Sequence, residues 1–486
     1  MASLTSKTIS LTSTKVVSSL LSIITGMILT RYLSKNEYGT FAQTFIMYDF
    51  LLPLISLGLP TSILYFFSNY FNQKKIVLEI FLILLFMSLL YSLFLYFGGI
   101  QILSKRFNNP LLIETSNLII FYPIYTIPVL IGPAIWIYQN RIKFNTIFSI
   151  LTNSILVIFI IITAAISQNY KYTIIAKLIL PLFFFPVAVY NIFSKLGGNW
   201  VFPQFSTILP ILKKTIPLSI ASIVGTIAIQ FSCFIVSLNS TTEDFAIYSI
   251  GAKEVPLISI ITNSISIILL AEMTKKFKDN NIISALDLFK KSCYISSIFL
   301  FPAMFFLLLY AKPFLVILYS SKYFDSYLPF TFFLFLIPIR VINYSIIYIA
   351  LGKSREMLFR SFVELLLTSI LSFVFIKFFG IVGAPLGIVV ASYFWSLPYN
   401  LIILSREFRC RILFLLPLKK LLMVLKISAY SLLVPLILIN FEFNVYLKFF
   451  ISSFFFVFSY GILLIKNDGD IFRRIENYFS KNNIIA

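Results

Sequence analysis

A small set of ionisable residues lies within or beside long apolar stretches of this chain. The acidic members are Asp49, Glu254 and Glu364, and the basic members are Lys15, Lys253 and Arg340. A carboxylate among apolar residues can bind a proton or a small cation, and a guanidinium or ammonium group can bind phosphate. The chain contains no histidine, which excludes catalysis by Ser-His or Cys-His pairs and metal binding by histidine. These residue types therefore favour reversible binding of ions over covalent chemistry.

Asp49 interrupts one of the most apolar stretches, "TFAQTFIMYDFLLPLISLGLPTSILYFF", at residues 40–67. It follows the start of this stretch by nine residues, which places it roughly 13 Å along a helix. A charged residue at the centre of a membrane costs about 2.5–3.5 kcal/mol, so it normally faces a cavity or a partner. One interpretation is that Asp49 lines an aqueous path, where it binds a coupling ion or a proton or balances a cation. The alternative is a structural hydrogen bond to a neighbouring helix.

Arg340 lies near the middle of another apolar stretch, "FLIPIRVINYSI". Its side chain would reach the membrane surface with difficulty from this position, and Pro338 beside it predicts a local break in helical hydrogen bonding. A guanidinium group suits phosphate because its fixed fork offers paired donors and keeps its proton. We therefore expect Arg340 to contact substrate or a counter-ion. A buried structural pair with Asp49 or Glu254 is the other interpretation.

The remaining candidates lie nearer to the ends of apolar stretches. Lys15 is roughly 9 Å from one end of its stretch, where it could meet a phosphate group or extend back to the lipid headgroups. Lys253 and Glu254 are adjacent in "YSIGAKEVPLI". On one continuous helix their side chains would point about 100° apart, so at least one should face the interior. Glu364 is a candidate ion-coupling residue, although its place near a boundary also fits an interfacial role.

The apolar stretches themselves predict the elements that position these charges. Of the 486 residues, 59% are hydrophobic and only 12% are charged, which is typical of an all-α polytopic membrane protein. Each stretch is about long enough to cross a bilayer as a helix. The predicted spans, about 14 in number, are 9–30, 40–66, 77–98, 112–138, 144–166, 172–193, 214–237, 246–271, 292–310, 327–350, 361–379, 381–404, 421–440 and 447–465.

Basic residues are distributed unevenly between the loops. The net charge is +21, but the 39 Lys and Arg residues are scattered between apolar stretches, so we expect no nucleic-acid partner. Most of them fall in alternate loops and in the two terminal segments, as the positive-inside rule predicts when both termini are cytoplasmic. Three cysteines without metal-ligand spacing predict neither a disulfide framework nor a metal site. We expect no cofactor beyond a coupling H⁺ or Na⁺.

Weak internal repeats suggest two related halves. "NEYGTFA" at 36–42 and "EDFAIYS" at 243–249 occupy corresponding outer loops, and "IWIYQNRIKFN" and "IYIALGKSREM" occupy corresponding inner loops. Duplicated halves are a common architecture of transporters. The predicted domains are a six-helix bundle at 1–194, a cytoplasmic linker at 195–213, a second six-helix bundle at 214–404, two additional transmembrane helices at 405–466 and a cytoplasmic tail at 467–486, with a short surface helix over 470–485.

Several of these segments also resemble one known family. "LTRYLSKNEYGTFAQ" at 29–43, "SLGLPTSI" at 56–63, "KPFLVILYSSKYFDS" at 312–326 and the segment 348–393 with its "FGIVGAPLG" turn follow the order and spacing found in it. They resemble the Wzx-type polysaccharide-export flippases of the multidrug/oligosaccharidyl-lipid/polysaccharide exporter superfamily. The resemblance covers most of residues 10–400. One departure is that Tyr38-Gly39 has Phe245-Ala246 as its second-half counterpart, where a glycine is usual.

The resemblance implies a transporter, not an enzyme, in a bacterial inner membrane. It implies a V-shaped pair of bundles that moves an undecaprenyl-pyrophosphate-linked oligosaccharide from the inner to the outer leaflet by alternating access, for O-antigen or capsule synthesis. In this interpretation Arg340, Lys15 and Lys253 bind substrate, and Asp49, Glu254 and Glu364 couple transport to ions. The implied partners are the lipid-linked oligosaccharide and membrane lipids, and a polysaccharide polymerase with its chain-length machinery is also compatible.

Other functions remain open at this point. A multidrug exporter of the same superfamily would take cationic substrates and would need an acidic cavity, whereas basic residues match or outnumber acids in these spans. A peptidoglycan-precursor flippase is closer, but the first span holds only Lys15 and no cluster of arginines. A membrane glycosyltransferase or polysaccharide polymerase would need a catalytic group in a sizeable outer loop, and the predicted outer loops are short.

Overall fold

The computed structural model describes residues 4–60, 63, 72–115, 119–203, 205–253, 255–442 and 444–469. All secondary structure in these ranges is helical, which confirms the predicted all-α class. The chain divides into two compact units. One unit is Ile9–Ser249, and the other is Met1–Thr8 with Ile250–Ala486. We call them the N-terminal and C-terminal units. The division of domains predicted from the sequence stays a prediction.

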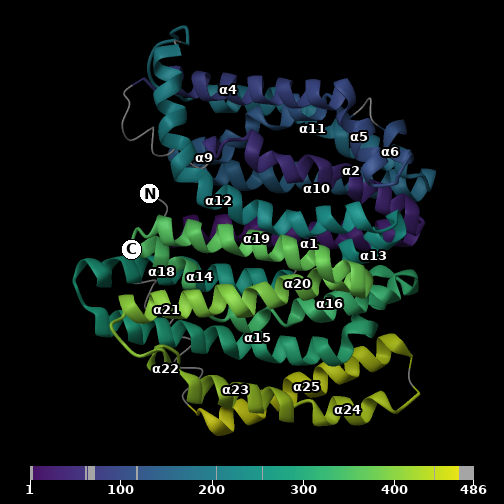
Figure 1. The fold of residues 1–486 in the computed structure, drawn as a ribbon, viewed down its shortest axis with the longest axis vertical. Coiled ribbons are helices and arrows are strands. Elements are labelled where there is room, and N and C mark those ends of the chain that lie inside the picture. The colour runs from purple at the N-terminus through teal and green to yellow at the C-terminus, as the bar shows by residue number, and fades with distance from the viewer. Residues whose placement is uncertain are drawn as a thin grey trace. The chain divides into compact units, whose positions relative to one another are not determined.

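Each unit is a bundle of helices, several of them long (Figure 1). The helices up to the end of the N-terminal unit are α1 (Leu4–Tyr32), α2 (Lys35–Ile55), α4 (Gln73–Phe94), η1 (Leu95–Gly99), α5 (Ile100–Arg106), α6 (Leu111–Glu114), α8 (Tyr122–Thr126), η2 (Pro128–Ile131), α9 (Gly132–Tyr138), α10 (Ile142–Ser167), α11 (Tyr170–Phe193), α12 (Phe205–Asn239) and α13 (Thr242–Gly251). The helices of the C-terminal unit are α14 (Pro256–Lys278), α15 (Ile282–Tyr319), η3 (Ser321–Ser326), α16 (Tyr327–Leu334), α17 (Ile337–Arg340), α18 (Tyr344–Ala350), α19 (Ser354–Phe379), η4 (Gly380–Val382), α20 (Gly383–Ala391), η5 (Ser392–Ser396), α21 (Leu397–Glu407), α22 (Ile412–Leu415), α23 (Leu418–Tyr430), α24 (Leu433–Ile439) and α25 (Val445–Asn467).

In the described residues, fewer helices have the length and hydropathy of a membrane span than the sequence predicts. Within the described residues, eight helices are long and apolar enough to cross a membrane, and the count is nine if one bent pair is a single span. The predicted count of 14 is therefore not confirmed. Several predicted spans are interrupted by short breaks, and the apolar helix at Tyr122–Tyr138 falls below the length required. The predicted surface helix at 470–485 lies outside the described residues.

Two of these interruptions fall where charged candidate residues lie. The predicted span 246–271 is broken between Gly251 and Pro256, so Lys253 lies in a non-helical link between α13 and α14. The expectation that Lys253 lies within one continuous helical span is therefore wrong, because α13 ends at Gly251 and α14 begins at Pro256, which donates no backbone hydrogen bond. The predicted break beside Pro338 is confirmed, since the helix pairs on either side of residues 335–336 are bent by 42°.

The turn "FGIVGAPLG" is explained by helix packing in the C-terminal unit. Gly380 has φ 60°, a conformation that favours glycine, and it ends α19. A Cβ on Gly383 would lie 2.2 Å from the backbone carbon of Phe375, and one on Gly387 would lie 2.6 Å from the backbone nitrogen of Ser372. These two glycines are four residues apart, so they share one face of α20 and let it approach α19 at backbone distance.

A buried polar network joins three segments of the N-terminal unit. The amide of Asn109 donates to Gln43 Oε1 (2.7 Å) and to Thr40 Oγ1 (2.9 Å), and Gln43 Nε2 donates to Ser237 Oγ (2.9 Å). All four residues are almost fully buried. Because an unpaired polar group in such a place would cost free energy, the network fixes α2 against α12 and the turn before α6.

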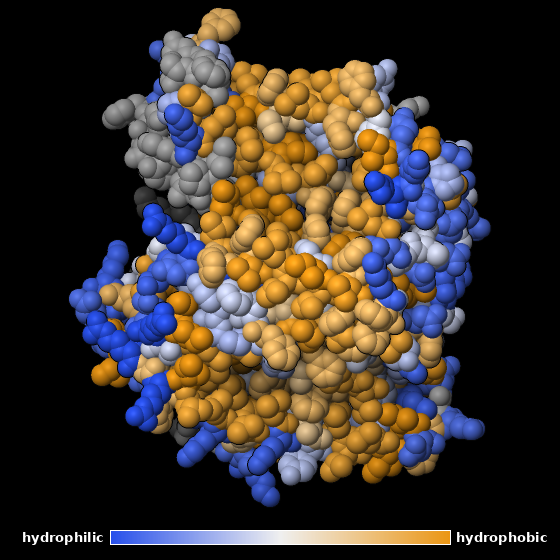
Figure 2. Space-filling view, in the orientation of Figure 1, coloured by the Kyte–Doolittle hydropathy of each residue, from blue (hydrophilic) through white to orange (hydrophobic). Residues whose placement is uncertain are grey.

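The lateral surface of both bundles is apolar. In the view of Figure 2, hydrophobic residues cover the middle of the helices, and hydrophilic residues gather toward the helix ends. In the C-terminal unit α23 and α25 pack on α15, where the hydroxyl of Tyr310 donates to Ser452 Oγ at 2.6 Å. This distribution is the one expected for helices whose middle contacts lipid and whose ends contact water.

Candidate functional site

In the N-terminal unit, Asp49 is matched with a basic residue from another helix. Asp49 is half-buried near the end of α2, and the side chain of Lys177 in α11 interacts with it electrostatically. The ammonium group of Lys177 also lies 3.3 Å from the ring centroid of Phe45 and 5.2 Å from that of Phe41. A cation over an aromatic face is attracted by the ring quadrupole. Lys177 is therefore a basic neighbour of Asp49, whose role in balancing a cation stays a prediction.

Tyrosine side chains surround this charge pair. The ring of Tyr48 lies 4.7 Å from that of Tyr122 and 6.3 Å from that of Tyr91. The hydroxyls of Tyr48 and Thr126 are hydrogen-bonded at 2.7 Å, and Tyr91 donates to the backbone oxygen of Met47 at 3.0 Å. These hydrogen bonds hold α2, α4 and α8 in place around Asp49. The segment of α2 that carries Asp49 is thus fixed by hydrogen bonds to α4 and α8.

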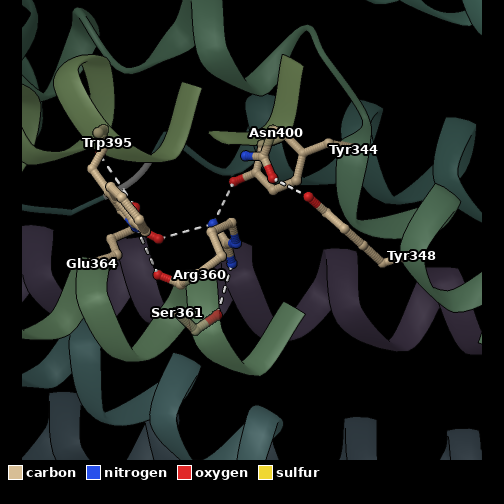
Figure 3. Close-up of polar contacts among 8 residues, drawn as sticks. Tyr344, Tyr348, Arg360, Ser361, Glu364, Trp395 and Asn400 are labelled. Atoms are coloured by element: carbon tan, nitrogen blue, oxygen red, sulfur yellow. Dashed lines mark hydrogen bonds and ion pairs between the residues drawn. The ribbon is translucent and has the colours of Figure 1, made fainter. Parts of the chain in front are cut away.

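In the C-terminal unit, Glu364 is paired inside its own helix. Arg360 Nη1 donates to Glu364 Oε2 at 2.8 Å, and Ser392 donates to Glu364 Oε1 at 3.4 Å (Figure 3). The same guanidinium group contacts the hydroxyl of Tyr344 and donates through Nη2 to Ser361 Oγ at 2.8 Å. Arg360 is 7% exposed. This arrangement balances the charge of Glu364 without a bound ion.

The residues around Arg360 come from three helical segments. Trp395 in η5 donates its indole N–H to the backbone oxygen of Arg360 at 3.1 Å, and Tyr348 in α18 donates to Asn400 Oδ1 at 2.9 Å (Figure 3). Among the residues that the structure describes, Arg360 Nε and Asn400 Nδ2 are buried and have no hydrogen-bond partner. Since buried polar groups are normally satisfied, these two donors are the places where water or a ligand oxygen would bind.

The structure places the other predicted site residues in less enclosed positions. Lys15 is exposed on α1, and Arg340 is exposed at the end of α17. Lys253 is half-buried, with its ammonium group 5.7 Å from the ring centroid of Tyr319. Glu254 lies outside the described residues. Within those residues, no group of three or more His, Cys, Asp or Glu side chains could hold a metal ion.

The sequence analysis did not select two basic residues of these sites. Arg360 precedes the predicted span 361–379 by one residue, yet α19 begins at Ser354 and includes it. Lys177 lies within the predicted span 172–193, and in the structure it is the eighth residue of α11. The spacing of Arg360 and Glu364 could have predicted their ion pair, because residues four positions apart meet on one face of a helix.

Comparison with known proteins identifies the family. A family model described as "Polysaccharide biosynthesis protein" matches residues 28–328, which is more than half of the chain. The chain belongs to this family. Among curated proteins, no significant match was found.

Solved structures share the fold of this family member over most of its length. A structure described as "Lipid II flippase MurJ, inward closed conformation" covers 96% of this chain and 99% of its own, with a TM-score of 0.73 and 18% identity. An inward-facing multidrug resistance MATE family transporter of the MOP superfamily covers 80% of this chain and 94% of its own, with a TM-score of 0.63 and 14% identity. A MOP superfamily transporter from Pyrococcus furiosus, described as having a binding pocket of reverse polarity, covers 83% and 95%, with a TM-score of 0.56 and 12% identity.

These similarities establish the fold of the polysaccharide biosynthesis protein. It is a fold that MOP superfamily flippases and transporters also have, and the family match agrees with the resemblance to polysaccharide-export proteins. Multi-pass insertion into a membrane agrees with the apolar helices.

Proposed function

We propose that this protein is a flippase that moves an oligosaccharide linked to undecaprenyl pyrophosphate from the inner to the outer leaflet of a bacterial plasma membrane. The product would enter the synthesis of a surface polysaccharide such as O-antigen or capsule. The observation that carries the proposal is the family match over 28–328 on a fold that a lipid II flippase shares over nearly the whole of both chains. With both termini cytoplasmic, the substrate would enter from the cytoplasmic leaflet.

In this proposal, basic residues bind the pyrophosphate group of the substrate. A pyrophosphate linkage is strongly anionic, and ammonium or guanidinium groups in a partly desolvated place bind it through charge-assisted hydrogen bonds. Lys253 and Lys177 are half-buried, and Lys15 and Arg340 are exposed. We propose each of these residues, two in each unit, as a separate contact for the pyrophosphate during its passage, while the prenyl chain stays in lipid. To the three residues chosen from the sequence we add Lys177.

Coupling to an H⁺ or Na⁺ gradient would make the transport directional, and Asp49 is the acid best suited to it. The carboxylate of Glu364 is held by Arg360 and Ser392, so it does not require a second cation. Asp49 has Lys177 on a different helix, so their interaction depends on how α2 and α11 are placed. Binding of a cation or proton by Asp49 would release Lys177 to the pyrophosphate. Glu254 remains a second candidate.

A multidrug cation antiporter is the alternative within the same fold. Two observations disfavour it. The MATE structure covers 80% of this chain, whereas the lipid II flippase covers 96%. In addition, Asp49 and Glu364 both have basic neighbours, Lys177 and Arg360, which reduces their attraction for a cationic drug. A polymerase or glycosyltransferase has no support from the fold.

The deciding experiment is reconstitution in liposomes with a fluorescent undecaprenyl-pyrophosphate oligosaccharide in the inner leaflet. We expect the label to reach the outer leaflet, where an external quencher or glycosidase detects it, in vesicles with protein but not in empty vesicles. An imposed H⁺ or Na⁺ gradient should accelerate the movement. Export of a cationic dye without movement of the lipid-linked sugar would refute the proposal in favour of the antiporter. In cells, deletion of the gene should cause lipid-linked repeat units to accumulate on the inner leaflet.

A further inference from the structure

The link between α21 and α23 carries a concentration of exposed positive charge. Residues 405–420, "SREFRCRILFLLPLKK", are here called the basic turn. Its exposed basic residues are Arg406, Arg409, Arg411, Lys419 and Lys420. Its one acidic residue, Glu407, is bound to Lys353 at 2.5 Å, so it does not neutralise them. Within the basic turn itself, these five positive charges are therefore not compensated by an acidic residue.

The turn is held firmly against the C-terminal unit. Phe408 is buried and stacks on Phe289 at 5.5 Å, with Phe277 at 5.8 Å. The amide of Cys410 donates to the backbone oxygen of Ser405 at 3.0 Å, and Leu415 is fully buried. These two buried side chains fix the backbone at both ends of the short stretch between them. The basic groups are thus displayed at defined positions and need little ordering before they bind a ligand.

Between these two anchors the turn exposes large apolar side chains. Leu413 is 73% exposed and Phe414 is 62% exposed, and both belong to the short helix α22, which lies between α21 and α23 in Figure 1. Ile412 beside them is exposed as well. Apolar side chains flanked by basic ones are typical of a segment at the boundary between headgroups and acyl chains.

We propose that the basic turn is a binding site for an anionic phospholipid at the membrane surface. Leu413 and Phe414 would enter the upper acyl region, and Arg406, Arg409 and Arg411 would bind the phosphate. The charge complementarity selects an anionic lipid over a zwitterionic one, because the apolar side chains alone would accept either. This inference concerns a lipid bound to the protein, and it does not depend on the transported substrate.

The test compares lipid binding by the full-length protein in nanodiscs of phosphatidylcholine with and without phosphatidylglycerol. The variant Arg406→Gln, Arg409→Asn, Arg411→Gln removes three charges, with asparagine at position 409 because that residue has φ 51°. We expect retention of phosphatidylglycerol in native mass spectrometry to weaken by about fivefold for each charge removed. We also expect the rise in melting temperature caused by phosphatidylglycerol to shrink.

The matched control removes three exposed lysines from other parts of the C-terminal unit, Lys312, Lys322 and Lys377, by substitution with glutamine. The control variant should keep most of its bound phosphatidylglycerol, because the proposed site is confined to the basic turn. Equal loss in both variants would show a general effect of net charge and would overturn the proposal, as would full retention in the first. If the first variant unfolds in phosphatidylcholine, the change Leu413→Ser, Phe414→Ser provides a second test. It keeps every charge and should still weaken retention.

Discussion

Arg360 and Glu364 form an ion pair one turn apart on α19, with Nη1 2.8 Å from Oε2, in which Arg360 is buried and Glu364 is half-buried. Taking two charges out of water is costly, and their mutual attraction repays that cost only with good geometry and further hydrogen bonds. Ser361, Tyr344 and Ser392 supply those hydrogen bonds. A membrane helix can therefore contain this pair because each charge has the other as its counter-ion.

Breaking the pair on one side should destabilise the protein more than removing both members. In Glu364→Gln, Arg360 keeps a buried charge without a counter-ion, and we expect a loss of about 3–5 kcal/mol in the free energy of unfolding. The double change Arg360→Met, Glu364→Leu should cost much less, since no charge remains. Thermal unfolding in detergent measures both. A double variant that is less stable than Glu364→Gln would contradict the assignment of this pair as mutual counter-ions.

Gly39 should be intolerant of even a methyl group. A Cβ at this position would lie 2.2 Å from the backbone oxygen of Thr242, so Gly39→Ala must push α2 away from α13. We expect a loss of about 1–3 kcal/mol, typical of overpacking. Gly461→Ala in α25 is the matched control, because nothing lies within 4 Å of a Cβ there. It should be neutral or stabilising by up to ~1 kcal/mol. Equal melting temperatures for the two variants would show that the α2–α13 contact is not tight.

The sequence predicted the helical class and the break at Pro338 because hydropathy and proline act locally. Both depend on a few neighbouring residues, and the structure confirms both. The predicted number of spans was not confirmed, because hydropathy does not show where a helix ends and another begins. Such a break lies around Lys253, between α13 and α14.

The partners of the charged residues were harder to predict. Asp49 stays a predicted site residue, and its basic neighbour Lys177 is more than a hundred positions away along the chain. Only the packing of α2 against α11 brings them together. Arg360 was not selected as a candidate because it lies just outside the predicted span 361–379, although α19 includes it. Basic residues at the edge of a predicted span are therefore worth testing for a carboxylate four positions away.

Asp49 and Lys177 should have separable effects on transport. With a lipid-linked oligosaccharide in liposomes, Asp49→Asn should abolish the acceleration caused by an ion gradient and keep the slower movement without a gradient. Lys177→Gln should lower both rates by about tenfold, a change of roughly 1.4 kcal/mol in the barrier, because it removes a phosphate partner. Asp287→Asn, an exposed acid on α15, is the control and should change neither rate. Gradient-dependent acceleration that persists in Asp49→Asn would assign the coupling ion to another residue.

The ion pair between Lys353 and Glu407 should make stability depend on pH in the alkaline range. The hydrogen bond to Glu407 raises the pKa of Lys353, which lies in the turn between α18 and α19. The ion pair therefore contributes fully to the stability of the fold below about pH 10.4, the pKa of lysine in the unfolded chain. This contribution is lost as the pH rises through the higher pKa of Lys353 in the folded protein. Because the pair is partly exposed, we expect it to contribute about 0.5–1 kcal/mol.

Unfolding of wild type and of Lys353→Met, followed from pH 8 to pH 12, tests this dependence. The difference in stability between wild type and Lys353→Met should be constant at the lower pH values. It should disappear at the highest pH, because Lys353 of the wild type is then neutral in both the folded and the unfolded protein. Lys278→Met, at the exposed end of α14, removes a lysine that belongs to no ion pair with Glu407 and should show no such change. If the difference for Lys353→Met grows with rising pH, the sign of the linkage is opposite and the pair does not stabilise the charged lysine.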